Sequence, residues 1–160
     1  MAEPPRLSEI TLPEEKSIIY FVTLCVKGRR RVVANAEMFD AIKTAIKELR
    51  RWDVLAAVIM PEHVHFIVGP REDRGLSIGD FATGLKRLVR KSLGSQDWEW
   101  QRGCFDHLLR SDENLESKWI YVQNNPVRHG LVQRAEDWPY YDFVNNDGKL
   151  AASSTESEIS

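Results

Sequence analysis

The stretch of residues 60–68, Met-Pro-Glu-His-Val-His-Phe-Ile-Val, limits more than any other how this chain can fold. Its β-branched and aromatic residues favour a strand from His63 onward. Side chains on a strand alternate between its faces, so His63 and His65 share one face. The opposite face is apolar and carries Val64, Phe66 and Val68. Neighbours on one face lie about 6.6 Å apart along the backbone, so two imidazoles there are close enough to bind one metal ion.

A second stretch, residues 119–128, reads Trp-Ile-Tyr-Val-Gln-Asn-Asn-Pro-Val-Arg. Tyr121 and Asn125 are four residues apart, which on a helix places both side chains on one face. The buried stripe predicted for this helix consists of Leu115, Trp119 and Val122. We expect the helix to begin after a cap at Ser111 and to end at Pro126, because the residue before a proline avoids helical geometry.

The two stretches supply complementary groups for phosphate chemistry. A tyrosine hydroxyl is a weak nucleophile near neutral pH, and the negative charge of a phosphodiester repels attack. A divalent cation neutralises developing charge on the phosphate oxygens. Two neutral imidazoles leave positions open for those oxygens, and the Asn125 amide oxygen could add a third ligand suited to Mg²⁺ or Mn²⁺.

In this order and separation, the stretches resemble the HUH single-strand DNA transposases, in particular the branch of REP-associated tyrosine transposases. The matching pieces are residues 60–65, 100–103 (Trp-Gln-Arg-Gly), 106–107 (Asp-His), 121–132 and 136–139 (Glu-Asp-Trp-Pro). The likeness runs from about residue 18 to residue 143, which is nearly all of the part expected to fold.

The resemblance implies an enzyme that cleaves and rejoins single-stranded DNA with hairpin or repetitive palindromic sequences. The reaction would pass through a covalent 5′-phosphotyrosine intermediate and depend on Mg²⁺ or Mn²⁺. Tyr121 is implied as the nucleophile. The implied metal ligands are His63, His65 and Asn125.

Three positions are not explained by the resemblance. Glu62 stands where the family usually has Asn, and an extra carboxylate could enter the metal site or repel DNA. Asp106 and His107 match the family only in position, and we assign no role to them.

The order of expected elements predicts the fold class. The strands are expected at 18–26, 54–60, 63–69 and 104–110, and the helices at 36–51, 78–91 and from 111 onward. This order matches the ferredoxin-like βαββαβ arrangement, an α+β fold. It has a four-stranded antiparallel sheet with two helices on one face. The histidines would then lie on the open face, and the extra C-terminal helix would cover them.

Several short signals set the ends of these elements. Asn35 and Ser77 are expected to cap the first two helices. The Pro61-Glu62 pair predicts a tight hairpin between the second and third strands. Residues 138–140, Trp-Pro-Tyr, are expected to close the domain as a strap.

The 160 residues suffice for one domain with a core, and 42% hydrophobic with 29% charged residues is typical of a soluble protein. We expect a flexible arm at 1–17, a catalytic domain at 18–144 and a disordered polar tail at 145–160. No apolar run approaches the roughly 20 residues of a membrane helix. Two separated cysteines, Cys25 and Cys104, fit a reduced, cytoplasmic setting.

The net charge of −2 does not indicate nucleic-acid binding, but the basic residues are clustered. The candidate DNA contacts are Lys27, Arg29, Arg30, Arg31, Lys86, Arg87, Arg90, Lys91 and Arg128. An ordinary solvated surface is the competing interpretation for each cluster. Whether the protein is a monomer or a homodimer stays open.

Three alternatives compete with the enzyme. A non-catalytic module could bind hairpin-containing single-stranded DNA without cutting it. A phosphoesterase built on two His-x-Thr/Ser elements is disfavoured, because the chain has one His-x-His and no second element. The third alternative is a purely structural role for both histidines.

Overall fold

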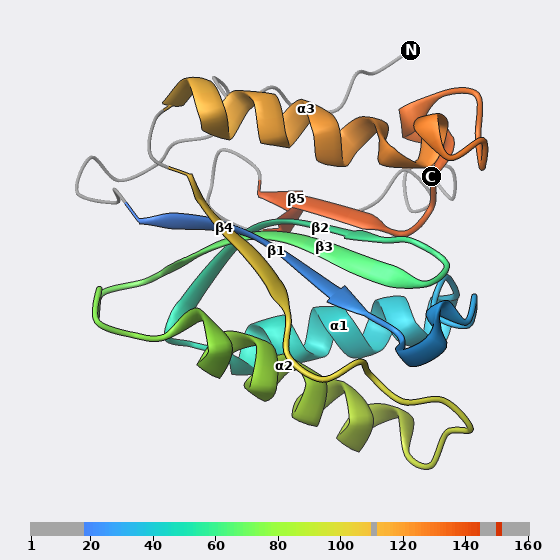
Figure 1. Ribbon diagram of the computed structural model, residues 1–160, viewed down its shortest axis with the longest axis horizontal. Coiled ribbons are helices and arrows are strands. Elements are labelled where there is room, and N and C mark those ends of the chain that lie inside the picture. The colour runs from blue at the N-terminus through green and yellow to red at the C-terminus, as the bar shows by residue number, and fades with distance from the viewer. Residues whose placement is uncertain (1–17, 110–111, 145–149, 152–160) are drawn as a thin grey trace.

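A computed structural model describes residues 18–109, 112–144 and 150–151 (Figure 1). The strands are β1 (Ile19–Cys25), β2 (Trp52–Ile59), β3 (His63–Pro70), β4 (Phe105–Leu109), β5 (Tyr141–Val144) and β6 (Leu150–Ala151). The helices are α1 (Ala36–Glu48), α2 (Ile78–Leu93) and α3 (Asp112–Arg128), with short 3-10 turns at Lys27–Arg29 and Ala135–Asp137. The expected arm at 1–17 and the cap at Ser111 lie outside the described residues. So does the expected tail at 145–160, apart from β6.

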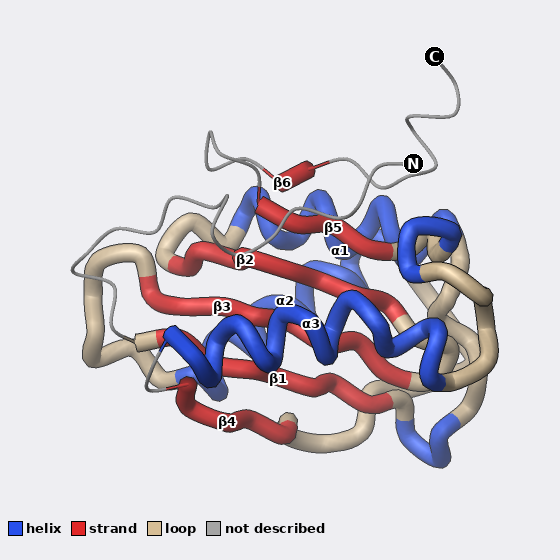
Figure 2. Tube along the Cα trace, turned by 90° about the horizontal axis from the view of Figure 1, so that it is seen from above, coloured by secondary structure: helices blue, strands red, loops and turns tan. Residues whose placement is uncertain are grey.

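The predicted ferredoxin-like arrangement is confirmed. The strands form one antiparallel sheet in the order β4-β1-β3-β2-β5-β6, whose first four members are the predicted ones. Helices α1 and α2 cover one face of this sheet, and α3 covers the other (Figure 1). Seen from above, α3 lies over β1 and β3 and runs roughly along them (Figure 2). The sequence did not predict the extension of the sheet by β5 and β6.

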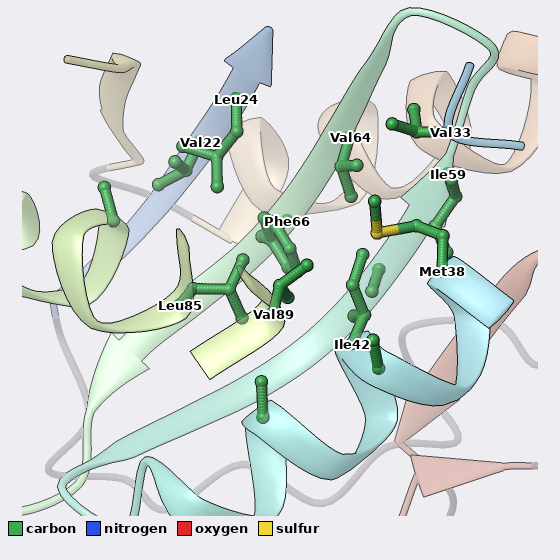
Figure 3. Close-up of a cluster of buried hydrophobic side chains, with 14 of the residues drawn as sticks. Val22, Leu24, Val33, Met38, Ile42, Ile59, Val64, Phe66, Leu85 and Val89 are labelled. Carbon is green, nitrogen blue, oxygen red and sulfur yellow. The ribbon is translucent and has the colours of Figure 1, made fainter. Parts of the chain in front are cut away.

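Strand β3 lies in the middle of the sheet, and all of its residues are buried. Its apolar face contributes Val64, Phe66 and Val68 to the core beneath α1 and α2 (Figure 3). Its other face places Ile67 in a second core beneath α3. The predicted alternation is therefore confirmed, and the histidine face is the one that α3 covers.

Strand β2 contains a bulge that the sequence did not predict. Its register against β3 shifts between Val54 and Ala56. Leu55 and Ala56 consequently both belong to the core beneath α3, although strict alternation would separate them. The bulge brings Val58 and Met60 to the same side, where they help to form the surface on which α3 packs.

The predicted stripe of α3 is also confirmed. Leu115, Trp119 and Val122 are buried in the core beneath α3. The expected strap closes this core, because the Trp138 Nε1–H donates a hydrogen bond to the Ile59 carbonyl at 3.0 Å. Asn35 caps α1 as predicted, with its side-chain oxygen 2.8 Å from the Met38 amide nitrogen. The Ser77 hydroxyl caps α2 through the Gly79 amide.

The prediction that Pro126 ends α3 is wrong. The helix continues to Arg128, and the turn that stops it contains Gly130, whose φ of +70° is the left-handed geometry that glycine adopts without strain. The Gly130 amide donates to the Val127 carbonyl, and the Leu131 amide donates to the Pro126 carbonyl. These two hydrogen bonds form a Schellman motif, which ends the helix. The extra residues bring Arg128 back over the helix face that carries Tyr121.

Within the described ranges, no helix is both long enough and apolar enough to cross a membrane.

Candidate metal and nucleic-acid site

The two histidines of β3 turn their rings toward each other beneath α3. Their Nε2 atoms lie 3.1 Å apart, and the side chains are buried, with residue exposures of 6% for His63 and 7% for His65. A metal ion bound between them would need a lone pair from each Nε2. That arrangement puts the proton of each ring on Nδ1.

Strand β1 orients His65 through two neighbouring side chains. The Thr23 hydroxyl oxygen lies 2.8 Å from His65 Nδ1, so an Nδ1–H can donate to it. Phe21 stacks on the His65 ring with a centroid separation of 5.1 Å. Both residues come from the strand that pairs with β3, where Thr23 is directly opposite His65. This support holds the Nε2 lone pair of His65 toward His63.

Glu62 approaches the other histidine. Its Oε1 lies 3.6 Å from His63 Nδ1, just beyond hydrogen-bonding distance. Within the described part of the chain, His63 Nδ1 is buried and has no hydrogen-bond partner. Glu62 therefore lies at the outer side of the His63 ring, where a small rotation would let it accept a hydrogen bond from the Nδ1–H group.

Burial keeps both imidazoles neutral at physiological pH. It lowers the pKa of His63 to about 4 and the pKa of His65 to about 3. Neighbouring charges modify this effect: Glu62 opposes it at His63, and the positive charge of Arg128 adds to it at His65. Neutral rings have the free lone pairs that a metal ligand requires.

Tyr121 lies beside His65 and is partly exposed to solvent. Its ring is 6.3 Å from that of His65 and meets Phe21 edge-on at 6.0 Å. The residue is 40% exposed, so a ligand in solution can reach it. Two cations flank the ring, since the Arg128 guanidinium carbon lies 3.8 Å and Lys118 Nζ 5.2 Å from its centroid.

Asn125 is completely buried, one helical turn from Tyr121. Its Oδ1 accepts a hydrogen bond of 3.0 Å from Arg128 Nη2. Its Nδ2 has no partner among the described residues. The predicted pairing of Tyr121 with Asn125 on one helix face thus places both beside Arg128.

The two histidine nitrogens can hold a divalent cation only if an amide oxygen or a substrate oxygen supplies further ligands. The described residues contain no group of three His, Cys, Asp or Glu side chains positioned to hold a metal ion. His63 and His65 provide two facing nitrogens. A third protein ligand from the predicted set has to be Asn125, whose amide oxygen suits Mg²⁺ or Mn²⁺.

Apart from Arg29, the structure does not bring the two predicted basic clusters to the histidines. The α2 cluster lies on the sheet face opposite α3 (Figure 1). Members of both clusters instead hold the loop of residues 97–103. Arg30 pairs with Asp97, Lys27 with Glu99, Lys86 donates to two loop carbonyls, and Arg90 donates to the Trp98 carbonyl and stacks on its ring. Arg29, Arg31, Arg87 and Lys91 are exposed, and the charge of Arg29 acts on His63.

Sequence reasoning missed three residues at the site. They are Phe21, Thr23 and His129, whose ring lies 6.3 Å from that of His63. Alternation along the first strand could have placed Phe21 and Thr23 on one face. Only the register with β3 shows that this is the histidine face.

No protein-family model matches the chain, but two curated proteins are similar to it over most of their length. The REP-associated tyrosine transposase of Escherichia coli (strain K12) is 27% identical over 131 residues, covering 78% of this chain and 75% of that protein. A Haemophilus influenzae protein named as a candidate REP-associated tyrosine transposase is 27% identical over 143 residues, covering 80% and 81%.

Solved structures show the same likeness. A REP-associated tyrosine transposase bound to a REP hairpin matches with a TM-score of 0.67 and 26% identity, covering 88% of this chain and 82% of that chain. A candidate transposase from Deinococcus radiodurans, with a TM-score of 0.50 and 19% identity over 71% of this chain and 95% of its own, supports the fold alone. In both sequence and fold, the chain therefore resembles the REP-associated tyrosine transposases, as its two motif stretches indicate.

Proposed function

We propose that the chain cleaves and rejoins single-stranded DNA through a covalent bond to Tyr121. The observation that carries the proposal is the exposed Tyr121 ring, 6.3 Å from the ring of His65 in a buried histidine pair. The names of the relatives support transposase chemistry. Because the structural neighbour is bound to a REP hairpin, we take DNA with a hairpin or repetitive palindromic sequence as the substrate.

In the proposed reaction the Tyr121 hydroxyl oxygen attacks the phosphorus of one phosphodiester. The bond from phosphorus to the 3′ oxygen breaks, the phenol loses its proton to solvent, and the leaving strand takes up a proton as a 3′-hydroxyl. The other strand end stays on the protein as a 5′-phosphotyrosine. A 3′-hydroxyl that attacks the same phosphorus restores a phosphodiester and returns the phenol.

The same proposal gives the buried residues a supporting role. His63, His65 and Asn125 would hold Mg²⁺ or Mn²⁺, which when bound neutralises charge on the phosphate oxygens. Thr23 and Phe21 orient His65. One chain contains both the nucleophile and the histidine pair, so we propose that Tyr121 serves its own site and that a monomer suffices.

Covalent capture tests this function. The purified chain is incubated with Mn²⁺ and a set of hairpin-bearing single strands, and denaturing gels are probed for a protein–DNA adduct. Wild type is expected to form an adduct that Tyr121→Phe lacks, because phenylalanine keeps the ring and removes the attacking oxygen. The double variant His63→Ala/His65→Ala is expected to lose the adduct as well.

The controls separate this function from its competitors. Tyr141→Phe, a substitution in β5, should leave the adduct unchanged. An adduct that persists in Tyr121→Phe refutes the proposal. Hairpin binding by wild type and Tyr121→Phe alike, with no adduct on any strand, would instead identify a non-catalytic DNA-binding module.

A further inference from the structure

Arg128 makes three contacts that join the nucleophile to the candidate third ligand. Its Nη2 donates to the Tyr121 carbonyl and to Asn125 Oδ1, each at 3.0 Å. Its guanidinium carbon lies 3.8 Å from the centre of the Tyr121 ring. A planar guanidinium can make all three contacts at once, whereas an ammonium is a single point charge.

These contacts leave the Asn125 amide half satisfied. Its oxygen is engaged by a cation, while its buried Nδ2 has no acceptor among the described residues. A buried donor without an acceptor destabilises the folded chain. The two ends of the amide thus suit different ligands. Nδ2 lacks a hydrogen-bond acceptor such as a phosphate oxygen, and Oδ1 is the atom that a metal ion would bind.

A metal ion and Arg128 compete for the same atom. A divalent cation on Asn125 Oδ1 would share that oxygen with Arg128 Nη2, which lies 3.0 Å from it. Two positive charges that contact one oxygen atom repel each other in a partly buried site. Binding of the cation is therefore weakened until something draws the guanidinium away.

We propose that Arg128 is a positioning residue that couples phosphate binding to metal binding at Asn125. A DNA phosphate accepts hydrogen bonds from the Arg128 guanidinium, whose paired N–H groups match the spacing of phosphate oxygens. Another phosphate oxygen accepts a hydrogen bond from Asn125 Nδ2. Asn125 Oδ1 is then released to the divalent cation. The inference rests on the proposed function, and by linkage metal ions and DNA strengthen each other's binding by the same factor.

The test measures Mn²⁺ affinity by calorimetry, with and without a hairpin-bearing single strand. All chains carry Tyr121→Phe, so that the strand stays intact. Without DNA, Arg128→Ala is expected to bind Mn²⁺ about fivefold or more tightly than the parent, because the competitor for Oδ1 is gone. A DNA phosphate supplies metal ligands in every variant, so DNA is expected to raise the Mn²⁺ affinity of all of them. This rise is expected to be smaller in Arg128→Ala than in the parent, by the same factor by which Arg128→Ala binds Mn²⁺ more tightly without DNA.

Arg128→Lys separates the bridging contacts from the charge. Lysine keeps the positive charge but cannot bridge two acceptors while it stacks, so this variant is expected to bind Mn²⁺ more tightly than the parent but less tightly than Arg128→Ala. It also carries the test if thermal melting shows that Arg128→Ala does not fold. Arg71→Ala, which removes an exposed arginine paired with Asp53 beyond the other end of β3, should leave the affinity unchanged.

Three results would overturn the inference. The first is an Mn²⁺ affinity without DNA that is unchanged or weaker in the Arg128 variants. The second is a DNA-induced rise in Mn²⁺ affinity that is equal in all chains. The third is a coupling between DNA and Mn²⁺ binding in Arg128→Lys that is as large as in the parent. If Mn²⁺ binding depends on His63 and His65 but is unaffected by substitution of Arg128, the metal site is supported and only the coupling is refuted. If His63→Ala/His65→Ala binds Mn²⁺ as well as the parent, both proposals fail.

Discussion

At the scale of single residues, the site depends on side chains that would not bind substrate themselves. Thr23 is the clearest case. Its hydroxyl lies 2.8 Å from His65 Nδ1, on the side of the ring away from His63. In metal sites, partners of this kind set the tautomer and direction of the ligating histidine, and their loss lowers metal affinity about 10- to 100-fold.

Thr23→Val is therefore expected to weaken Mn²⁺ binding by about tenfold or more. Valine has nearly the shape of threonine but no hydroxyl, so the strand should stay folded. Thr23→Ser keeps the hydroxyl and serves as the matched control, with an expected affinity close to wild type. Calorimetric titration with Mn²⁺ measures both, and equal affinities for the valine and serine variants would contradict this role of Thr23.

At the scale of elements, helix α3 determines whether a site exists. It contributes Tyr121, Asn125 and Arg128 through one face and packs on the sheet through another. Trp119 is 1% exposed in that packing face, while its neighbour Ile120 is 49% exposed. Docking of α3 therefore rests on a small set of buried apolar side chains.

Trp119→Ala is expected to lower the free energy of unfolding by about 3–5 kcal/mol, because it removes a large side chain from a closed core. Ile120→Ala on the adjacent exposed position should change it by less than about 0.5 kcal/mol. Urea denaturation followed by circular dichroism measures both. Similar losses for the two variants would show that α3 is not held by the Trp119 face.

At the scale of the whole molecule, the sheet separates two groups of cations. Lys118 and Arg128 flank Tyr121 on the α3 side. Arg87 and Lys91 belong to α2 on the opposite side (Figure 1). With a net charge of −2, the protein has no general attraction for DNA, so binding must depend on where its few site cations lie.

Lys118→Ala is expected to weaken binding of hairpin DNA and to reduce the slope of log affinity against log salt by about 0.7, the value for one phosphate contact on a single strand. Arg87→Ala removes an exposed charge on the far face and should leave the slope unchanged. Fluorescence anisotropy at several salt concentrations gives both slopes. A larger effect for Arg87→Ala would place the DNA on the α2 side instead.

Much of this arrangement could be predicted because it depends on residues close together in the chain. Alternation along residues 63–68 assigned the histidines to one face, and a spacing of four residues put Tyr121 beside Asn125. The element order indicated the ferredoxin-like sheet and left the extra helix for the open face. The structure confirms each of these expectations, and Arg128 contacts both Tyr121 and Asn125.

Other features were decided by tertiary contacts. Strand register set Thr23 against His65, and the bulge in β2 adjusted the surface beneath α3. Hydrogen bonds around Gly130 carried the helix past Pro126, which returned Arg128 to Tyr121. Local periodicity dictates which face a side chain takes, because covalent geometry repeats along the chain. What that side chain meets depends on how separate segments align, and no local pattern contains that information.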